Sequence, residues 1–226
     1  MGGHAADRKT GRDSGPLAQR SVVCSQVFKR WQELFAVGQV AFQANFWNEQ
    51  DGCLYDLVDQ NHEQGSVDAS MRPNQIFAVG GLPLVLLNDQ KARAVVDSVE
   101  QHLLTPLGLR SLSPNHPDYK AHYEGGVLQR DGAYHQGTVW PWLIGPFVEA
   151  WLRVRGNTDE AKQAAGHRFL PPLETHLEQA GIGHISEICD AEQPYLPRGC
   201  PFQAWSFAEY LRIKYSVLEL SPLEDV

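Results

Sequence analysis

The stretch between Tyr134 and Trp142 concentrates aromatic rings and hydrogen-bonding groups in the order Tyr-His-Gln-Gly-Thr-Val-Trp-Pro-Trp. A sugar site needs this mixture, because flat aromatic faces stack on the apolar C–H patches of a pyranose ring while rigid polar groups bind its hydroxyls. Tyr134, Trp140 and Trp142 could supply the faces, and His135 and Gln136 the polar contacts. The alternative is a buried aromatic segment, since tryptophan lies in cores more often than on ligand platforms. This stretch alone leaves both interpretations open.

A second stretch carries an acidic side chain in a glycine-flanked loop. Glu187 lies between Ile185 and Ile188, so its carboxylate is expected to be partly desolvated. Cleavage of a glycosidic bond needs two carboxyl groups, one to protonate the leaving oxygen and one to activate water or attack carbon. The alternative for Glu187 is a solvent-facing or capping role, which is the commoner use of an isolated glutamate.

The bulk composition excludes several classes of function. With 226 residues, 42% of them hydrophobic, the chain can fill a real core. Its net charge of −8 argues against a nucleic-acid or acidic-membrane surface. No apolar run reaches membrane-spanning length. Residues 1–20 are polar and lack the apolar stretch of a secretory signal, so we expect them to be a disordered lead-in.

The cysteines and histidines indicate no metal and no cofactor. The four cysteines form no C-x-x-C pair and no zinc spacing, which favours a reducing, cytoplasmic compartment. His135 has no second histidine at ligand spacing, so a sugar hydroxyl is a better partner for it than a metal. A Gly-rich phosphate loop and a Ser-His-Asp order are also missing, and we therefore predict neither a metal nor a cofactor.

Helical periodicity dominates the rest of the chain. Asn88 or Asp89 is a good N-cap, and apolar residues then recur at helical spacing as far as Leu103. Gly80-Gly81 and Pro171-Pro172 should interrupt the helices that contain them. A long segment from residue 109 to 134 has little periodicity and reads as a loop. The helices are expected to cover roughly residues 21–46, 76–87, 89–103, 138–154, 157–179 and 202–215.

This pattern predicts a mainly α fold in which short connections pair antiparallel helices and strands are confined to loops. Five segments then occur in one order along roughly residues 21–216, and as an ordered set they resemble the C-terminal part of glycogen debranching enzymes, the amylo-α-1,6-glucosidase domain. The segments are Arg72-Pro73-Asn74-Gln75-Ile76, Tyr123-Glu124-Gly125-Gly126, Asp131 to Trp142, Ile185-Ser186-Glu187, and Arg198-Gly199-Cys200 with Gln203-Ala204-Trp205-Ser206.

The resemblance implies an (α/α)₆ toroid of helix hairpins that hydrolyses α-1,6-linked glucose at glycogen branch stubs. Water attacks directly, and the anomeric carbon is inverted. Glu187 holds the place of the family's general base. The family's general acid lies in a Thr-Trp-Met-Asp type motif, upstream of everything matched, and this chain contains no such sequence. Residues 21–220 therefore correspond to about half of the toroid. Glycogen or another branched α-glucan and the missing N-terminal half are the implied partners.

The resemblance also places weaker candidates around the sugar. Arg72 could bind substrate or pair a buried carboxylate, and Glu124 could contact hydroxyls or hold its loop. Asp131 could touch substrate, although a charge near a helix start is the simpler interpretation. Gln203 and Trp205 complete the set. Two alternative functions remain at this point: a related glucoside hydrolase of the glucoamylase or trehalase type, and a non-catalytic carbohydrate-binding remnant.

Overall fold

The computed structural model describes residues 15–220, with side chains from Phe28 to Leu220. Two compact units divide the chain, residues 1–41 and residues 42–226. Residues 15–41 of helix α1 (Gly15–Phe46) form the described part of the first unit, and the helix ends, as predicted, at Phe46. It begins at Gly15 rather than near Ser21. Most of the expected disordered lead-in falls on residues 1–14, which lie outside the described part.

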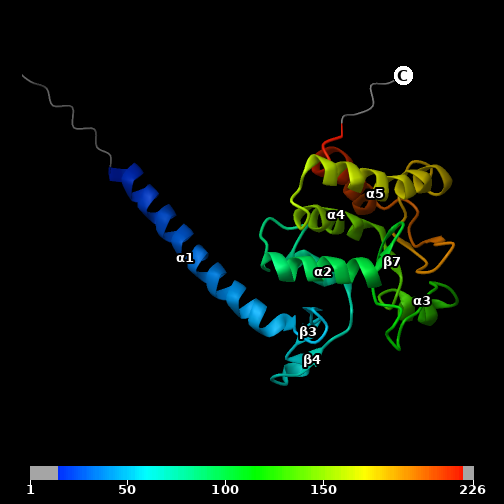
Figure 1. The fold of residues 1–226 in the computed structure, drawn as a ribbon, viewed down its shortest axis with the longest axis horizontal. Coiled ribbons are helices and arrows are strands. Elements are labelled where there is room, and N and C mark those ends of the chain that lie inside the picture. Colours follow the sequence, from blue (N-terminus) through cyan, green and yellow to red (C-terminus); the bar gives the residue numbers. More distant parts are fainter. Residues whose placement is uncertain (1–14, 221–226) are drawn as a thin grey trace, which may run out of the picture. The chain divides into compact units, whose positions relative to one another are not determined.

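Three helices of the second unit contribute a large part of its core and lie in successive layers (Figure 1). They are α2 (Asp89–His102), α4 (Ile144–Arg153) and α5 (Asp159–Gln179). The predicted N-cap of α2 is confirmed, because Asn88 Oδ1 accepts a hydrogen bond of 2.9 Å from the Lys91 backbone N–H. Thr158 caps α5 in the same way through Ala161. The predicted inner stripe of α2 is buried: Ala92, Val95, Val96 and Val99.

A five-stranded antiparallel sheet of very short strands positions the central segments. In order it contains β5 (Leu104–Thr105), β6 (Gly108–Arg110), β7 (Val139–Trp140), β8 (Ile188–Cys189) and β9 (Pro197–Arg198). The expected helix over 138–154 is therefore wrong at its start. Residues 139–140 pair with β6, a 3₁₀ turn η3 (Pro141–Leu143) follows, and only then does α4 begin. The sheet brings the aromatic stretch beside the loop that carries Glu187.

The expected helix over 76–87 is also wrong. A 3₁₀ helix η2 (Pro73–Ala78) starts at the proline as predicted, but regular structure then stops. Gly81 adopts a left-handed backbone with φ of +75°, which a helix cannot contain. Gly80 lies directly against α4, because a Cβ there would lie 2.5 Å from the Ala150 nitrogen. The segment is thus a backbone-to-backbone contact rather than a buried helix.

The remaining elements are short. Two hairpins precede η2, pairing β1 (Trp47–Asn48) with β2 (Cys53–Leu54) and β3 (Leu57–Val58) with β4 (Val67–Asp68), and a 3₁₀ turn η1 (Gln60–His62) lies inside the second hairpin. A short helix α3 (Val127–Ala133) occupies part of the expected loop. Helix α5 continues through Pro171-Pro172, where a break was expected. The helix predicted over roughly 202–215 is present as α6 (Ala204–Leu211) and its π-helical continuation η4 (Arg212–Val217).

The described residues therefore form a mainly α structure with short antiparallel sheets. Within residues 15–220, no helix combines the length and the apolar character needed to cross a membrane.

The contact at Gly80 gives a stability prediction. Gly80→Ala should destabilise the second unit by about 1–3 kcal/mol, because the new methyl group has backbone atoms on two sides and cannot be accommodated by a rotamer change. The control is Gly132→Ala in α3, where the nearest atom to a new Cβ is the end of Lys120 at 4.0 Å. Urea unfolding of both variants measures the difference. Equal midpoints for the two variants would contradict the packing argument.

Candidate active site

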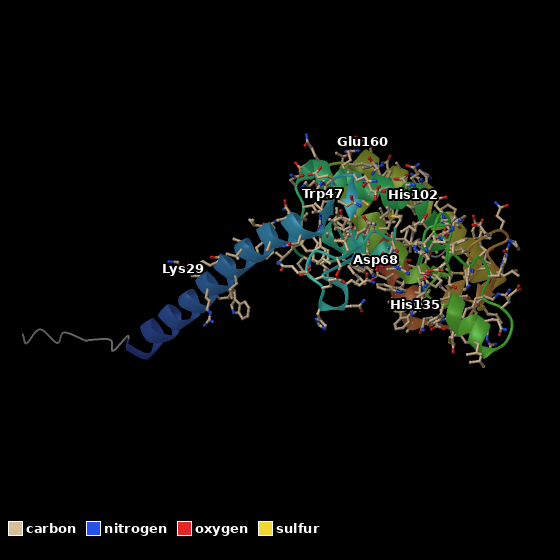
Figure 2. All side chains as sticks on the ribbon, turned by 90° about the horizontal axis from the view of Figure 1, so that it is seen from below. Lys29, Trp47, Asp68, His102, His135 and Glu160 are labelled. Atoms are coloured by element: carbon tan, nitrogen blue, oxygen red, sulfur yellow. The ribbon has the colours of Figure 1, made fainter. Side chains whose placement is uncertain are left out.

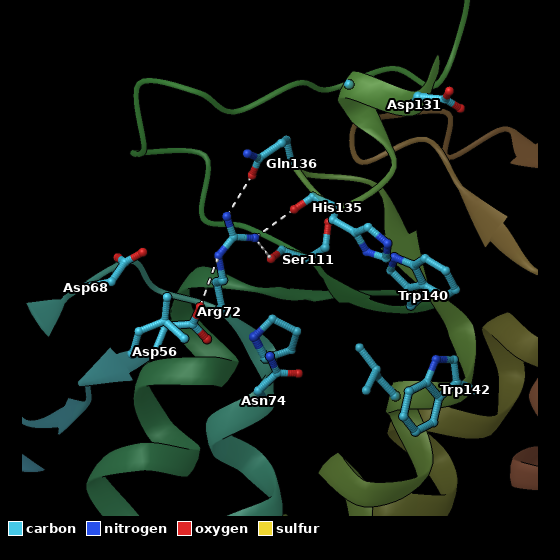
Figure 3. A pocket seen from close by; sticks show the side chains of 14 residues that line it. Asp56, Asp68, Arg72, Asn74, Ser111, Asp131, His135, Gln136, Trp140 and Trp142 are labelled. Atoms are coloured by element: carbon cyan, nitrogen blue, oxygen red, sulfur yellow. Dashed lines mark hydrogen bonds and ion pairs between the residues drawn. The ribbon is translucent and has the colours of Figure 1, made fainter. Parts of the chain in front are cut away.

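Arg72 is the centre of a hydrogen-bond network at the N-terminus of η2 (Figure 3). Its Nη1 donates to the carbonyl oxygens of Ser111 (3.0 Å) and His135 (2.7 Å), and its Nη2 donates to Gln136 Oε1 (2.7 Å). Its Nε lies 3.5 Å from Asp56 Oδ2 in an ion pair whose two side chains are mostly buried. The guanidinium therefore joins three chain segments, and the pairing with a carboxylate anticipated for Arg72 is present.

A cavity of about 640 Å³ opens around this network. Asp68 and His135, which are both labelled in Figure 2, both line it. Six of the predicted site residues contribute to its wall: Arg72, Asp131, His135, Gln136, Trp140 and Trp142. Sequence reasoning missed four polar residues that also line it: Asp56, Asp68, Asn74 and Ser111. Two signals for them were present in the sequence: the possible pairing of Arg72 with an unidentified carboxylate, and the place of Asn74 in the segment from Arg72 to Ile76.

The carboxyl groups of the cavity differ in their surroundings. Burial raises the pKa of Asp56 above its ordinary value, although the Arg72 charge opposes this effect. Hydrogen bonds from Ser70 hold the pKa of Asp68 below its ordinary value. Asp131 is exposed, and its carboxylate points away from Arg72 in Figure 3. The cavity thus presents both charged and hydrogen-bonding groups, as binding of a polyhydroxylated ligand requires.

The two tryptophans of the motif have different environments. Trp140 is buried, with 9% exposure, and its indole N–H donates to the Tyr134 carbonyl oxygen at 3.2 Å. The His135 ring stacks on it with centroids 5.3 Å apart. Trp142 is only half-buried and stacks on Phe77 with centroids 5.9 Å apart. Trp142 therefore has the more accessible ring, whereas Trp140 has the packing of a core residue.

Glu187 is held by two donors at the start of β8. The Tyr134 hydroxyl donates to its Oε1 at 2.6 Å, and the Cys200 backbone N–H donates to its Oε2 at 3.0 Å. The Glu187 backbone N–H donates in turn to the Cys200 carbonyl oxygen at 2.8 Å. Glu187 is half-buried between Ser186 and Ile188, which are both buried, as its apolar neighbours predicted.

Glu187 does not itself line the cavity around Arg72. Tyr134 connects the two, because its hydroxyl binds Glu187 while its ring contacts His135 and Trp140, each with centroids 4.8 Å away. The sheet pairing of Val139 with Cys189 brings these segments together. The candidate site therefore has two parts, a polar cavity and a fixed carboxylate, with one tyrosine between them.

Two buried groups fix the loops around Glu187. His176 of α5 accepts a hydrogen bond of 3.2 Å from the Ser186 backbone N–H through Nε2, and burial lowers the pKa of this imidazole. Asp190 accepts hydrogen bonds from Arg198 and from the Tyr123 backbone N–H. Burial alone would raise the pKa of Asp190, but these hydrogen bonds outweigh it and hold the pKa below its ordinary value. Asp190 thereby ties the loop before α3 to β8 and β9.

The remaining predicted residues lie apart from the cavity wall. Glu124 is exposed in the loop before α3. Gln203 is half-buried at the start of α6, where its backbone N–H donates to Ile185 at 3.0 Å, and Trp205 is 51% exposed. Among the side chains that the structure describes, no group of three His, Cys, Asp or Glu residues could hold a metal ion.

Comparison with known proteins identifies the family to which the chain belongs. Residues 17–212 match the amylo-alpha-1,6-glucosidase family, and the chain belongs to that family. It is similar to the glycogen debranching enzyme of Saccharomyces cerevisiae, with 26% identity over 168 residues. That similarity covers 66% of this chain and 11% of the yeast protein, so the chain spans a small part of the length of this relative.

The His176–Ser186 contact gives a prediction for pH. Between the lowered pKa of the folded state and 6.5, the unfolded chain binds a proton at His176 and the folded chain does not, so stability should fall as pH decreases through this window. His176→Gln keeps an acceptor for Ser186 but does not titrate. Urea unfolding at about pH 7.5 and about pH 5.5 should show a smaller loss for this variant than for the wild type, because all other titrating groups are shared. Equal losses would contradict a neutral buried His176.

Proposed function

We propose that this chain takes part in the hydrolysis of α-1,6-linked glucose at the branch stubs of glycogen or a similar branched α-glucan, with Glu187 as the general base of an inverting reaction. The observation that carries the proposal is the fixed Glu187 carboxylate beside a polar, tryptophan-lined cavity in a chain of the amylo-alpha-1,6-glucosidase family. Similarity to a yeast glycogen debranching enzyme supports the choice of substrate.

The chemistry of an inverting base suits Glu187. Each of its carboxylate oxygens accepts one hydrogen bond, which leaves an acceptor site free on each oxygen. A water molecule bound there could lose its proton to the carboxylate as it attacks the anomeric carbon. The glycosidic oxygen leaves with a proton from a second carboxyl group, about 6.5–9.5 Å from the first in inverting enzymes.

That second carboxyl group belongs, in this proposal, to a part of the domain outside this chain, because no Thr-Trp-Met-Asp sequence is present. The chain would then be the base-bearing half of an (α/α)₆ toroid, and the isolated chain should release no glucose. Helix α1 carries Phe28, Trp31, Leu34, Val37 and Val40 at helical spacing, and an apolar row of this kind favours burial against a partner surface.

The terminal glucose would occupy the cavity around Arg72. Trp142 offers the accessible ring for stacking, and Asp56, Asp68 and Asn74 offer partners for hydroxyl groups. Neutral sugar is compatible with a wall that carries both acidic groups and a guanidinium. The three described cysteines are free, which supports a cytoplasmic location.

A non-catalytic role in carbohydrate binding is the second candidate. It is favoured by the absence of Glu187 from the cavity wall and of the family's acid motif from the sequence. The two candidates differ in the role of Glu187. The catalytic candidate needs Glu187 for turnover, whereas the binding candidate does not.

Glu187→Gln tests the assignment of the base. In a polypeptide that joins this chain to an acid-bearing half of the domain, glucose release from limit dextrin should fall by about a hundredfold to ten-thousandfold, because the amide keeps the size of the side chain but cannot take a proton. The melting temperature of the variant should equal that of the wild type. Near-wild-type turnover would exclude Glu187 as the base, and an inactive wild-type assembly would favour the binding role.

Trp142→Ala and Trp140→Ala separate a sugar platform from a core residue. Trp142→Ala should weaken binding of a maltooligosaccharide to the folded chain by about 1–3 kcal/mol. Trp140→Ala should instead lower stability by about 3–5 kcal/mol, because it removes a buried ring. Titration calorimetry and thermal unfolding on both variants give the two quantities. Unchanged affinity in folded Trp142→Ala would refute the platform.

A further inference from the structure

The hydrogen bond between Tyr134 and Glu187 has the geometry of a strong, charge-assisted contact. The separation of 2.6 Å between Tyr134 Oη and Glu187 Oε1 lies in the range of O–H···O⁻ bonds. Burial and this hydrogen bond raise the pKa of the Tyr134 phenol, so the hydroxyl keeps its proton and remains the donor. Because a phenol has only one hydrogen, Tyr134 has none left to donate to a sugar hydroxyl.

The Tyr134 ring is fixed as firmly as its hydroxyl. It contacts the rings of Tyr123, His135 and Trp140 at centroid distances of 5.7, 4.8 and 4.8 Å, and its carbonyl oxygen accepts the Trp140 indole N–H. Three aromatic neighbours and a backbone hydrogen bond limit the movement of the ring and of the hydroxyl that it carries.

The other carboxylate oxygen of Glu187, Oε2, lies beside Gly199, which has no side chain. Gly199 has φ of +65°, and a Cβ there would lie 2.5 Å from Glu187 Oε2. The absence of a side chain leaves space for the carboxylate to reach the Cys200 backbone N–H. Both oxygens of Glu187 are thus fixed from outside their own loop, one by a phenol and one by the backbone beside a glycine.

We infer that Tyr134 and Gly199 are positioning residues for the Glu187 carboxylate, Tyr134 by donating its hydroxyl hydrogen to Oε1 and Gly199 by leaving room for Oε2. This inference rests on the proposed function of Glu187, and it replaces the expected role of Tyr134 as a sugar ligand. A glutamate side chain has several rotatable bonds, and a base that must meet one water molecule gains from being held in one orientation.

Binding of a charged sugar analogue to the 226-residue chain tests this inference. The probes are 1-deoxynojirimycin, a protonated iminosugar, and neutral maltose, both measured by titration calorimetry. The ratio of their affinities reports how well a negative charge is placed at the site. We expect Glu187→Gln and Tyr134→Phe each to lower this ratio by about fivefold to tenfold, because affinity for the cation should fall more than affinity for maltose. Gly199→Ala should act similarly, because its methyl group displaces Oε2.

Tyr119→Phe is the matched control, because it removes a phenol that donates to another carboxylate, Glu192, at 2.8 Å. Its ratio should equal that of the wild type, and thermal unfolding confirms that each variant is folded. If Glu187→Gln lowers the ratio and Tyr134→Phe does not, the inference is wrong and the proposed base stands. Equal weakening of both probes by Tyr134→Phe would make it a sugar ligand and also overturn the inference. No cationic preference in the wild type, or a preference unchanged in Glu187→Gln, contradicts the proposed function itself.

Discussion

The guanidinium of Arg72 is the interaction on which the rest of the site depends. It donates to two carbonyl oxygens and one side-chain amide that come from segments 39 to 64 residues away, and it is neutralised by Asp56. Removing one partner of such a buried pair leaves an uncompensated charge, which is far more costly than the loss of a surface ion pair. The turn that carries His135 and Gln136 is therefore held in place by the same residue that opens η2. The Arg72 network thus connects segments that line the cavity.

The fixed turn then sets the position of Tyr134 and, through it, of Glu187. Antiparallel pairing of β7 with β8 brings the aromatic motif to the acidic loop, and Tyr134 spans the remaining gap with its hydroxyl. From the far side, Ser186 is tied to His176. A cavity and a carboxylate that are distant in sequence thus form one unit through short strands and single hydrogen bonds, rather than through a large sheet.

Local signals in the sequence predicted much of this arrangement. The Asn88 cap and the apolar stripe of α2 could be found because both depend on residues within one helix. The sheet β5 to β9 could not, because strands of two or three residues carry no alternation that distinguishes them from loops. The proline at the start of η2 was informative, whereas the packing of Gly80 against Ala150 was not visible in the local pattern.

In the site, too, local features could be predicted from the sequence and long-range contacts could not. The sequence offered a buried carboxylate as one of two partners for Arg72 and predicted partial desolvation of Glu187, since both follow from neighbouring residue types. Asp56 as the partner, and Tyr134 as a donor 53 residues before Glu187, depend on the tertiary fold. The most direct measurement of the central claim is a crystal structure of the chain bound to a branched maltooligosaccharide. The account predicts a glucose ring against Trp142, with its anomeric carbon one water molecule away from a Glu187 still bonded to Tyr134. A sugar bound elsewhere, or a Tyr134 hydroxyl turned from Glu187 to the sugar, would contradict it.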